Sequence, residues 1–195
     1  MTRREHANVE TATIRPARAA DFDAIAALTN HYIRTTAIHF GYEEMSPAAF
    51  IESWQNSRER YPWFVADEAG QVVGYAKGSP WRERAAYAWA VELGLYVRPD
   101  RHGRGLGTKL YRSLLNALRA QGFHTAVGGI TLPNESSVRL HESLGFVKVA
   151  HFKDAGWKLN AWHDVGFWQI ELAPGPARAI GAAGAGIEPG PGRST

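Results

Sequence analysis

A glycine-rich, basic segment is where residue types and spacing point most directly to chemistry. "RPDRHGRGLGTKLY", residues 98–111, places Gly103, Gly105 and Gly107 before a helical pattern, with Arg101 and Arg104 interleaved. A strand that enters a glycine turn and then opens a helix offers free backbone N–H groups and the positive helix end to an anion. The segment predicts a phosphate-binding loop; an ordinary strand-to-helix turn is the alternative.

The spacing separates three kinds of phosphate loop. A nucleoside-triphosphate loop has the pattern Gly-x-x-x-x-Gly-Lys-Ser/Thr, whereas here Thr108 stands between Gly107 and Lys109. A dinucleotide loop opens a parallel strand–helix–strand unit and has an acidic residue about twenty places on. Strands are expected ahead of this loop, and no suitable acid ends the following strand "HTAVGGITL". The third kind, a loop that holds the pyrophosphate of a coenzyme, fits the spacing.

A lone acid in an apolar strand is the second feature. Glu92 is the only carboxylate in "AAYAWAVELGLYV", residues 85–97, which should form a central strand. Burying an unpaired charge is costly, so this side chain faces either a pocket or, at a sheet edge, water. In a pocket, desolvation raises the pKa of a glutamate, which suits a general base that works near neutrality.

Two stretches that occur in order, "RHGRGLGTKLYRSLL" and "LPNESSVRLHESLGF", resemble the coenzyme loop and the later asparagine-to-helix segment of GNAT N-acetyltransferases. The segments "NHYI", "ERYPWFVA", "PWRERAAYAW", "QGFHTAV" and "WHDVGFWQ" resemble, more narrowly, the phosphinothricin and methionine-sulfoximine acetyltransferase branch over about residues 30–170. The resemblance implies acetyl-CoA as co-substrate and acetyl transfer to the α-amine of phosphinothricin, methionine sulfoximine or methionine sulfone. It also implies a homodimer and a link to herbicide resistance.

The resemblance implies where acetyl-CoA is held. The matching residues are Gly103, Arg104, Gly105, Leu106, Gly107 and Thr108 for the pyrophosphate, and Leu95, Tyr96, Val97 and Asn134 for the pantetheine arm. Asn134 is also a good helix N-cap, and the two roles are compatible. His102 departs from the family pattern, which has Gln or Arg there. The flanking arginines would supply the charge, and His102 could make cofactor affinity depend on pH.

The same resemblance implies the catalytic groups. Glu92 matches the proposed base of the family, acting directly or through water. His141 stands where many members have a tyrosine that protonates the leaving thiolate, and an imidazole has an ordinary pKa of about 6.5. Its role stays open between acid, base partner of Glu92 and orienting hydrogen bond. From the residues alone, the alternative is a surface histidine on the helix "RLHESLG".

Two arginines precede the Glu92 strand. Arg82 and Arg84 would clamp a carboxylate or phosphinate, since a guanidinium binds such groups at two points; solvated turn charges are the alternative. The further acceptor-binding residues implied are Leu93, Gly94, Phe40 and Tyr87, with Trp162 and His163 closing the site from the last hairpin. The aromatic residues of "WHDVGFWQ" fit core or dimer packing equally well.

A mixed α/β (α+β) sheet would position these residues. Apolar periodicity and turn residues predict strands over 11–17, two within 63–78 about a turn at 69–70, and 85–99, 124–132, 146–154 and 162–172. The predicted helices are 19–34, with Asp21 as N-cap, 46–60, with Ser46 as N-cap, 108–121 and 134–146. The last two strands would form a hairpin with an elaborated turn. We expect the GNAT fold, a mixed central sheet of about 6–7 strands flanked by about 4 helices.

Bulk composition limits the remaining possibilities. With 195 residues and 45% hydrophobic content, residues 11–173 would be a single GNAT domain between a flexible arm, 1–10, and a disordered Pro/Gly/Ala-rich tail, 174–195. Without cysteine, and with Gly145 where "HESLG" would need a second histidine, no metal is expected. The net charge of +3 without a basic stripe argues against binding to nucleic acid. No long apolar run or secretory signal is present, so a cytoplasmic protein that spans no membrane is expected.

Two other functions stay open. One is a GNAT acetyltransferase for another amine: a polyamine, an aminoglycoside or a protein N-terminus. An acidic pocket would favour the first two, and Arg82 and Arg84 argue against such a pocket. The other is a coenzyme-binding module without catalysis, which would have no need of Glu92.

Overall fold

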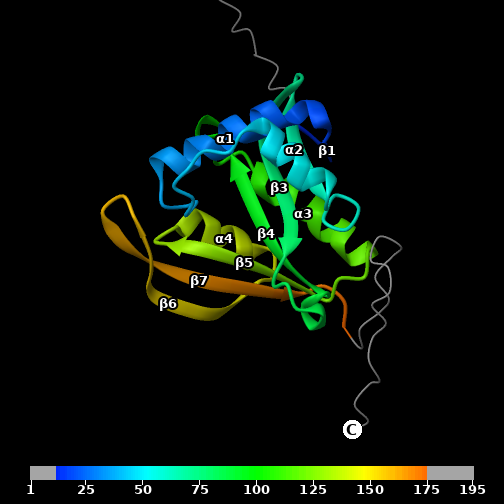
Figure 1. The fold of residues 1–195 in the computed structure, drawn as a ribbon. Helices are drawn as coiled ribbons and strands as arrows, with labels where there is room; N and C mark the ends of the chain where they lie inside the picture. Colours follow the sequence, from blue (N-terminus) through cyan, green and yellow to red (C-terminus); the bar gives the residue numbers. More distant parts are fainter. Residues whose placement is uncertain (1–11, 175–195) are drawn as a thin grey trace, which may run out of the picture.

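The computed structural model describes residues 12–174, which form a twisted seven-stranded sheet with helices on both faces (Figure 1). The strands are β1 (Thr13–Pro16), β2 (Trp63–Glu68), β3 (Gln71–Pro80), β4 (Ala90–Val97), β5 (Thr125–Leu132), β6 (Val147–Lys158) and β7 (Ala161–Glu171). The α-helices are α1 (Phe22–Thr35), α2 (Pro47–Gln55), α3 (Leu106–Ala120) and α4 (Glu135–Ser143). The predicted mixed sheet with about four helices is confirmed. The predicted arm 1–10, and the predicted tail from residue 175 on, lie outside the described residues.

The sheet order is β1-β2-β3-β4-β5-β7-β6. All neighbours are antiparallel except β4 and β5, which run parallel from Ala90↔Thr125 to Leu93↔Gly128. A parallel pair needs a crossover, and α3 provides it. The glycine-rich loop therefore lies at the carboxyl end of β4, the end at which open α/β sheets bind ligands.

The two faces of the sheet carry different helices. Leu110, Leu114 and Leu118, the predicted row of α3, are fully buried against one face, and α4 packs on the same side. Helices α1 and α2 pack on the other face in a second apolar cluster. Side chains alternate along a strand, and Val91 and Leu93 of β4 point into the α3 cluster. Glu92 between them therefore points to the face of α1 and α2.

Two predicted boundaries and one predicted turn are wrong in ways that affect the site. Helix α2 ends at Gln55, and residues 85–87 form a short 3-10 turn ahead of β4. The amides of Tyr87 and Ala88 bond back to carbonyls of residues 84 and 85, so local turn bonds replace strand pairing there. The last hairpin has no elaborated turn, because two positive-φ residues, Leu159 and Asn160, close it tightly. The irregularity is instead a register shift within β6, between residues 152 and 156.

The two predicted helix caps differ in outcome. Ser46 accepts a hydrogen bond from the amide of Ala49 at 3.2 Å and caps α2 as predicted. Asp21 precedes α1, but its carboxylate accepts from the backbone of Arg18 and forms an ion pair with Arg15, both at 2.7 Å. It therefore caps the preceding 3-10 turn and ties α1 to β1.

Candidate active site

The parallel strands β4 and β5 separate halfway along their length. Their pairing ends at Leu93↔Gly128. Beyond that point residues 94–97 pair only with β3, and residues 129–132 pair only with β7. Figure 1 shows the two arrows diverging. The divergence opens the centre of the sheet beside Glu92.

The opening presents unpaired backbone groups of β4. The amide of Arg98 donates to the carbonyl of Val73 on β3. Because hydrogen bonding alternates along antiparallel strands, the backbone of Tyr96 also faces β3, whereas that of Leu95 and Val97 faces the opening. The carbonyl of Val97 already accepts from the hydroxyl of Tyr32 at 2.6 Å and lies 2.9 Å from His102 Nε2. Of the three predicted pantetheine residues, the backbone of Leu95 and the amide of Val97 therefore offer groups that an extended ligand can pair with.

Two glycines of the loop are required by the backbone. Gly103 has φ of +74° and Gly105 has φ of +72°, and a Cβ at either position would meet nothing within 4 Å. The constraint is therefore left-handed conformation and not space. Gly107 differs, because its Cβ would lie 3.1 Å from Leu140 and 3.2 Å from Leu95. Gly107 thus lets α3 pack closely on its neighbours, in addition to keeping its amide accessible.

Helix α3 begins without a side-chain cap. Its N-cap residue is Gly105, whereas α2 and α4 are capped by Ser46 and Asn134. The first amides of a helix have no partner within the helix. Those of Leu106 and Thr108, with Gly107 between them, are therefore available to an anion at the positive end of the helix.

A cavity of about 260 Å³ connects the loop, the free edge of β4 and the start of α4. Every predicted cofactor-binding residue except Arg104 lines it: Leu95, Tyr96, Val97, Gly103, Gly105, Leu106, Gly107, Thr108 and Asn134. Arg104 is exposed and lies outside this lining. The structure therefore brings the two sequence halves of the predicted coenzyme site together.

The predicted charges around the loop are partly neutralised. Arg101 donates to Glu68 at 2.7 Å and to Asp100 at 2.6 Å, and Arg98 also binds Asp100. Arg101 thus anchors the loop instead of supplying a free charge. His102 fastens the loop as well, since its Nε2 lies 2.9 Å from the carbonyl of Val97.

Asn134 caps α4 and lines the cavity, which is compatible with both roles that the sequence left open. Its Oδ1 accepts from the amide of Ser137 at 3.2 Å and from the hydroxyl of Ser136 at 3.0 Å, which caps α4. The side-chain NH₂ donates to no atom within residues 12–174. Because Asn134 lines the cavity, this NH₂ can donate to a ligand there.

Glu92 lies where β4 and β5 separate. Its side chain is half-buried, and its Oε1 approaches Gly129, where a Cβ would stand 3.7 Å away. Burial raises the pKa of Glu92, while the nearby charges of Arg82 and Lys77 oppose that rise. A partly desolvated carboxylate that is accessible from the opening has the properties of a general base.

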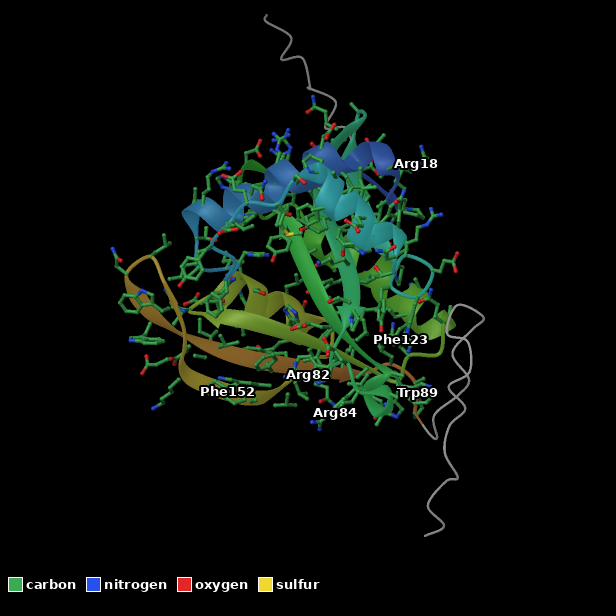
Figure 2. All side chains as sticks on the ribbon, in the orientation of Figure 1. Arg18, Arg82, Arg84, Trp89, Phe123 and Phe152 are labelled. Atoms are coloured by element: carbon green, nitrogen blue, oxygen red, sulfur yellow. The ribbon has the colours of Figure 1, made fainter. Side chains whose placement is uncertain are left out.

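The two predicted arginines differ in their relation to Glu92. The guanidinium of Arg82 stacks on Trp81 at 4.0 Å and lies close enough to Glu92 to lower the pKa of that carboxyl. Arg84 is exposed at the start of the 3-10 turn and does not contribute to the pKa of Glu92. Figure 2 labels both beyond the end of β3. The structure thus brings Arg82, and not Arg84, to the charge of Glu92.

His141 is buried, so its interpretation as a surface residue is wrong. Its Nδ1 donates to the carbonyl of Ser137 at 2.8 Å, and its Nε2 lies 3.3 Å from the hydroxyl of Tyr111. Burial lowers the pKa of His141, so near neutrality the ring is uncharged and Nε2 accepts from Tyr111. Gly128 makes room for this ring, because a Cβ there would lie 2.3 Å from Nε2. His141 and Glu92 therefore lie on opposite faces of β5.

The remaining predicted acceptor residues are dispersed. Gly94 is on the face of Glu92, whereas the Leu93 side chain is buried under α3 and only its backbone borders the opening. Phe40 packs on Gly156 and His163, which joins the α1–α2 loop to the last hairpin. Tyr87 is exposed in the 3-10 turn.

The two residues predicted to close the site from β7 lie on opposite faces. His163 shares the face of Phe40, and its Nε2 lies 2.9 Å from the carbonyl of Lys158. Trp162 lines a separate cavity of about 600 Å³ with His151 and Asp164, beside the start of α4. The two-residue period of a strand separates these neighbours, so Trp162 does not reach the face of Glu92.

Lys77 is the charged residue of this face that sequence reasoning missed. It is opposite Gly94 in the β3–β4 register and is only partly exposed. Its Nζ lies 4.8 Å from the ring of Trp63. The signal that could have found it is the same as for Glu92, a lone charge within "VVGYAKGSP".

Comparison with known proteins identifies the family of the chain. The model of the acetyltransferase (GNAT) family matches residues 25–146. A phosphinothricin N-acetyltransferase from Streptomyces viridochromogenes is 45% identical over 168 residues, which cover 86% of this chain and 92% of that protein. An L-methionine sulfoximine/L-methionine sulfone acetyltransferase from Pseudomonas aeruginosa is 39% identical over 84% of this chain and 96% of its own length.

A solved structure extends the likeness to the bound co-substrate. A phosphinothricin acetyltransferase from Sinorhizobium meliloti, in complex with acetyl-CoA, superposes with a TM-score of 0.81 at 33% identity, covering 87% of this chain and 93% of that chain. The chain therefore belongs to the acetyltransferase (GNAT) family, and acetyl-CoA is its acetyl donor. The uncapped start of α3 and the free β4 edge fit its pyrophosphate and its pantetheine arm.

Two further observations concern the described residues alone. Residues 12–174 contain no group of three or more histidine, aspartate or glutamate side chains placed to hold a metal ion. Within the same range, none of the helices combines the length and apolarity that crossing a membrane requires.

Proposed function

We propose that this chain acetylates the α-amine of a small amino-acid-like acceptor, with phosphinothricin, methionine sulfoximine and methionine sulfone as the compounds to test. The observation that carries the proposal is the position of Glu92. It is a half-buried carboxylate with a raised pKa at the point where the coenzyme edge of β4 begins. The names of the relatives supply the acceptor class.

Acetyl-CoA supplies an acetyl thioester at the opening. Glu92 accepts a proton from the acceptor ammonium, directly or through one water, and the neutral amine then forms the C–N bond as the C–S bond breaks. CoA leaves as a thiolate, which takes up the second proton that the nitrogen loses, so the products are the amide and the free CoA thiol. Arg82 binds the α-carboxylate of the acceptor, because a guanidinium matches a carboxylate in geometry and charge. Arg84, Tyr87 and Phe40 lie apart from Glu92 and are assigned no direct contact with the acceptor.

His141 is assigned the orienting role among the three that the sequence left open. Its Nδ1–H is used by Ser137, and its Nε2 accepts from Tyr111. It therefore has no proton to give at neutral pH without first gaining one. The assignment is that His141 fixes α4 against β5 and so keeps Asn134 at the cavity.

The finer parts of the proposal concern assembly and location. We assign a homodimer in the cytoplasm, a state implied by the family resemblance. Acetylation of phosphinothricin would make the chain a herbicide-resistance protein, because the acylated amine is no longer cationic. Size-exclusion chromatography with light scattering tests the dimer; a monomer at micromolar concentration would contradict it.

The function is tested with an amine panel. The protein is incubated with acetyl-CoA and phosphinothricin, methionine sulfoximine, methionine sulfone, spermidine, an aminoglycoside or a peptide with a free N-terminus, and thiol release is followed. We expect release with the first three only, and its loss in Glu92→Gln. Release with spermidine or the aminoglycoside alone would favour an acetyltransferase for another amine. Tight acetyl-CoA binding without release for any amine would favour a binding module.

A further inference from the structure

Lys77 is a half-buried ammonium with no protein acceptor. Within residues 12–174 its Nζ makes no hydrogen bond or ion pair, although Glu92 is near enough to favour its charged form. Its aliphatic chain lies over Gly94, where a Cβ would stand 3.4 Å from Cγ and 3.5 Å from Cε. Burial lowers the pKa of Lys77. The Nζ of Lys77 is not among the fully buried side-chain atoms that lack a partner, so it stays accessible to a ligand. Partial burial of an ammonium without a protein acceptor still costs free energy, so its presence here calls for a reason.

Packing does not supply that reason. The Nζ of Lys77 lies over the ring of Trp63, and such a contact contributes about 0.5–2 kcal/mol. An uncharged side chain of the same length would cover Gly94 and Trp63 without the cost of a half-buried charge. The pKa of Glu92 does not require Lys77 either, because Arg82 lowers that pKa more than Lys77 does.

The order of charges along β4 suggests a ligand. Arg82 precedes the strand, Glu92 lies near its start, and Lys77 is registered opposite Gly94, two residues beyond Glu92. Both cations lower the pKa of Glu92, and along the direction of β4 Arg82 comes before Glu92 and Lys77 after it. An α-amino acid whose side chain ends in an anion has the complementary order: carboxylate, ammonium, anion.

We propose that Lys77 binds the anionic side-chain group of the acceptor and so makes the site selective for acidic amino-acid analogues. This inference rests on the proposed function, in which Arg82 binds the α-carboxylate and Glu92 takes the proton from the amine. A lysine ammonium suits the role, because its three donors rotate freely and accept an oxyanion in several orientations. The selectivity thus comes from β3, a strand that contributes nothing to the coenzyme cavity.

Two acceptors allow a direct test, because they differ almost only in the charge of the group that ends the side chain. Phosphinothricin ends in a methylphosphinate and methionine sulfone in a methylsulfone; the two groups are nearly isosteric, and only the first is anionic. The measurement is kcat/KM for both acceptors with wild type, Lys77→Met and Lys77→Gln. Lys148→Met is the matched control, because Lys148 also lies over a tryptophan, Trp168 at 5.4 Å, away from the site. Melting temperature and acetyl-CoA affinity verify that each variant folds. If Lys77→Met does not fold, the comparison with wild type rests on Lys77→Gln.

We expect both Lys77 variants to lower the phosphinothricin to methionine sulfone ratio of kcat/KM by about 10- to 100-fold, the range of a lost charge-assisted hydrogen bond. Lys148→Met should leave the ratio within about twofold, because exposed charges contribute little. Equal losses with both acceptors, or an unchanged ratio, would overturn the inference while leaving the proposed function intact. Wild type that acetylates neither acceptor would overturn the proposed function, and this inference with it.

Discussion

The coenzyme loop and the face around Glu92 hold the two halves of the site in opposite ways. The loop, residues 98–108, works through backbone: two left-handed glycines and the uncapped start of α3 present amides to an anion. The proposed acceptor face would work through side chains from separate strands, Lys77 on β3 and Glu92 on β4. The loop is contiguous in sequence, whereas the face exists only once the sheet has formed.

This difference indicates which part of the site can change its specificity for the acceptor. Backbone amides bind any pyrophosphate that fits, so the loop can stay constant across acetyltransferases with different acceptors. The acceptor face depends on a few charged side chains, each of which one substitution can remove. Substitutions in the loop should therefore alter acetyl-CoA use for every acceptor, and substitutions on the face should alter acceptors selectively.

Removal of the Glu92 carboxylate should have the largest effect. We expect Glu92→Gln to lower kcat by about 10²- to 10⁴-fold, the usual contribution of a general base, and to leave acetyl-CoA affinity within about threefold. In wild type kcat/KM should rise with pH as Glu92 loses its proton, with a midpoint above 4.5 because burial raises the pKa. This rise should be absent in the variant. A wild-type turnover in Glu92→Gln would exclude it as the base.

The two arginines should differ in effect. We expect Arg82→Gln to raise the acceptor KM by about 10- to 100-fold through loss of a charge-assisted hydrogen bond, with acetyl-CoA KM unchanged. The acidic limb should also move to higher pH, because the charge of Arg82 opposes the raised pKa of Glu92. Arg84→Gln is the matched control and should change the acceptor KM by less than about threefold. Equal effects of the two variants would contradict the placement of Arg82 alone beside Glu92.

A loop glycine should affect the co-substrate alone. We expect Gly105→Ala to raise the acetyl-CoA KM by about 10-fold for every acceptor, because a left-handed alanine costs about 1–2 kcal/mol. Gly70→Ala is the control, since φ is +82° there and nothing lies within 4 Å of its Cβ. It should lose similar stability in thermal melts and keep its acetyl-CoA KM. A change of acceptor preference in Gly105→Ala would contradict the inference that the loop acts on acetyl-CoA alone.

His141 should have the smallest kinetic effect. His141→Asn keeps a donor for the Ser137 carbonyl and loses the acceptor for Tyr111. We expect kcat within about fivefold of wild type and a melting temperature lower by about 2–8 °C, as for one unsatisfied buried group. A loss of 100-fold in kcat with an unchanged melting temperature would instead make His141 the acid.

Sequence patterns were sufficient for the individual strands and helices and for the loop because these features are local. The glycine spacing, the leucine row of α3 and the lone Glu92 are visible within windows of about fifteen residues. What could not be predicted depends on pairing between distant strands. That Trp162 and His163 point to opposite faces follows from the two-residue period of the strand, but which of them shares the face of Glu92 follows from register. The separation of Glu92 from His141 likewise depends on which helix covers each face. Lys77 escaped notice because only the β3–β4 register places it opposite Gly94.

The separation of β4 and β5 has a consequence for the lifetime of the folded protein. These strands share four residue pairs, and within the sheet these pairs are what connects β1–β4 to β5, β7 and β6. A molecule that pairs with the free edge of β4 binds the folded state alone, so at 100 times its Kd it adds about 2.7 kcal/mol to the free energy of unfolding. Resistance of this chain to heat and proteases should therefore follow the supply of acetyl-CoA in its surroundings, and starved cells should lose the protein faster than well-fed ones.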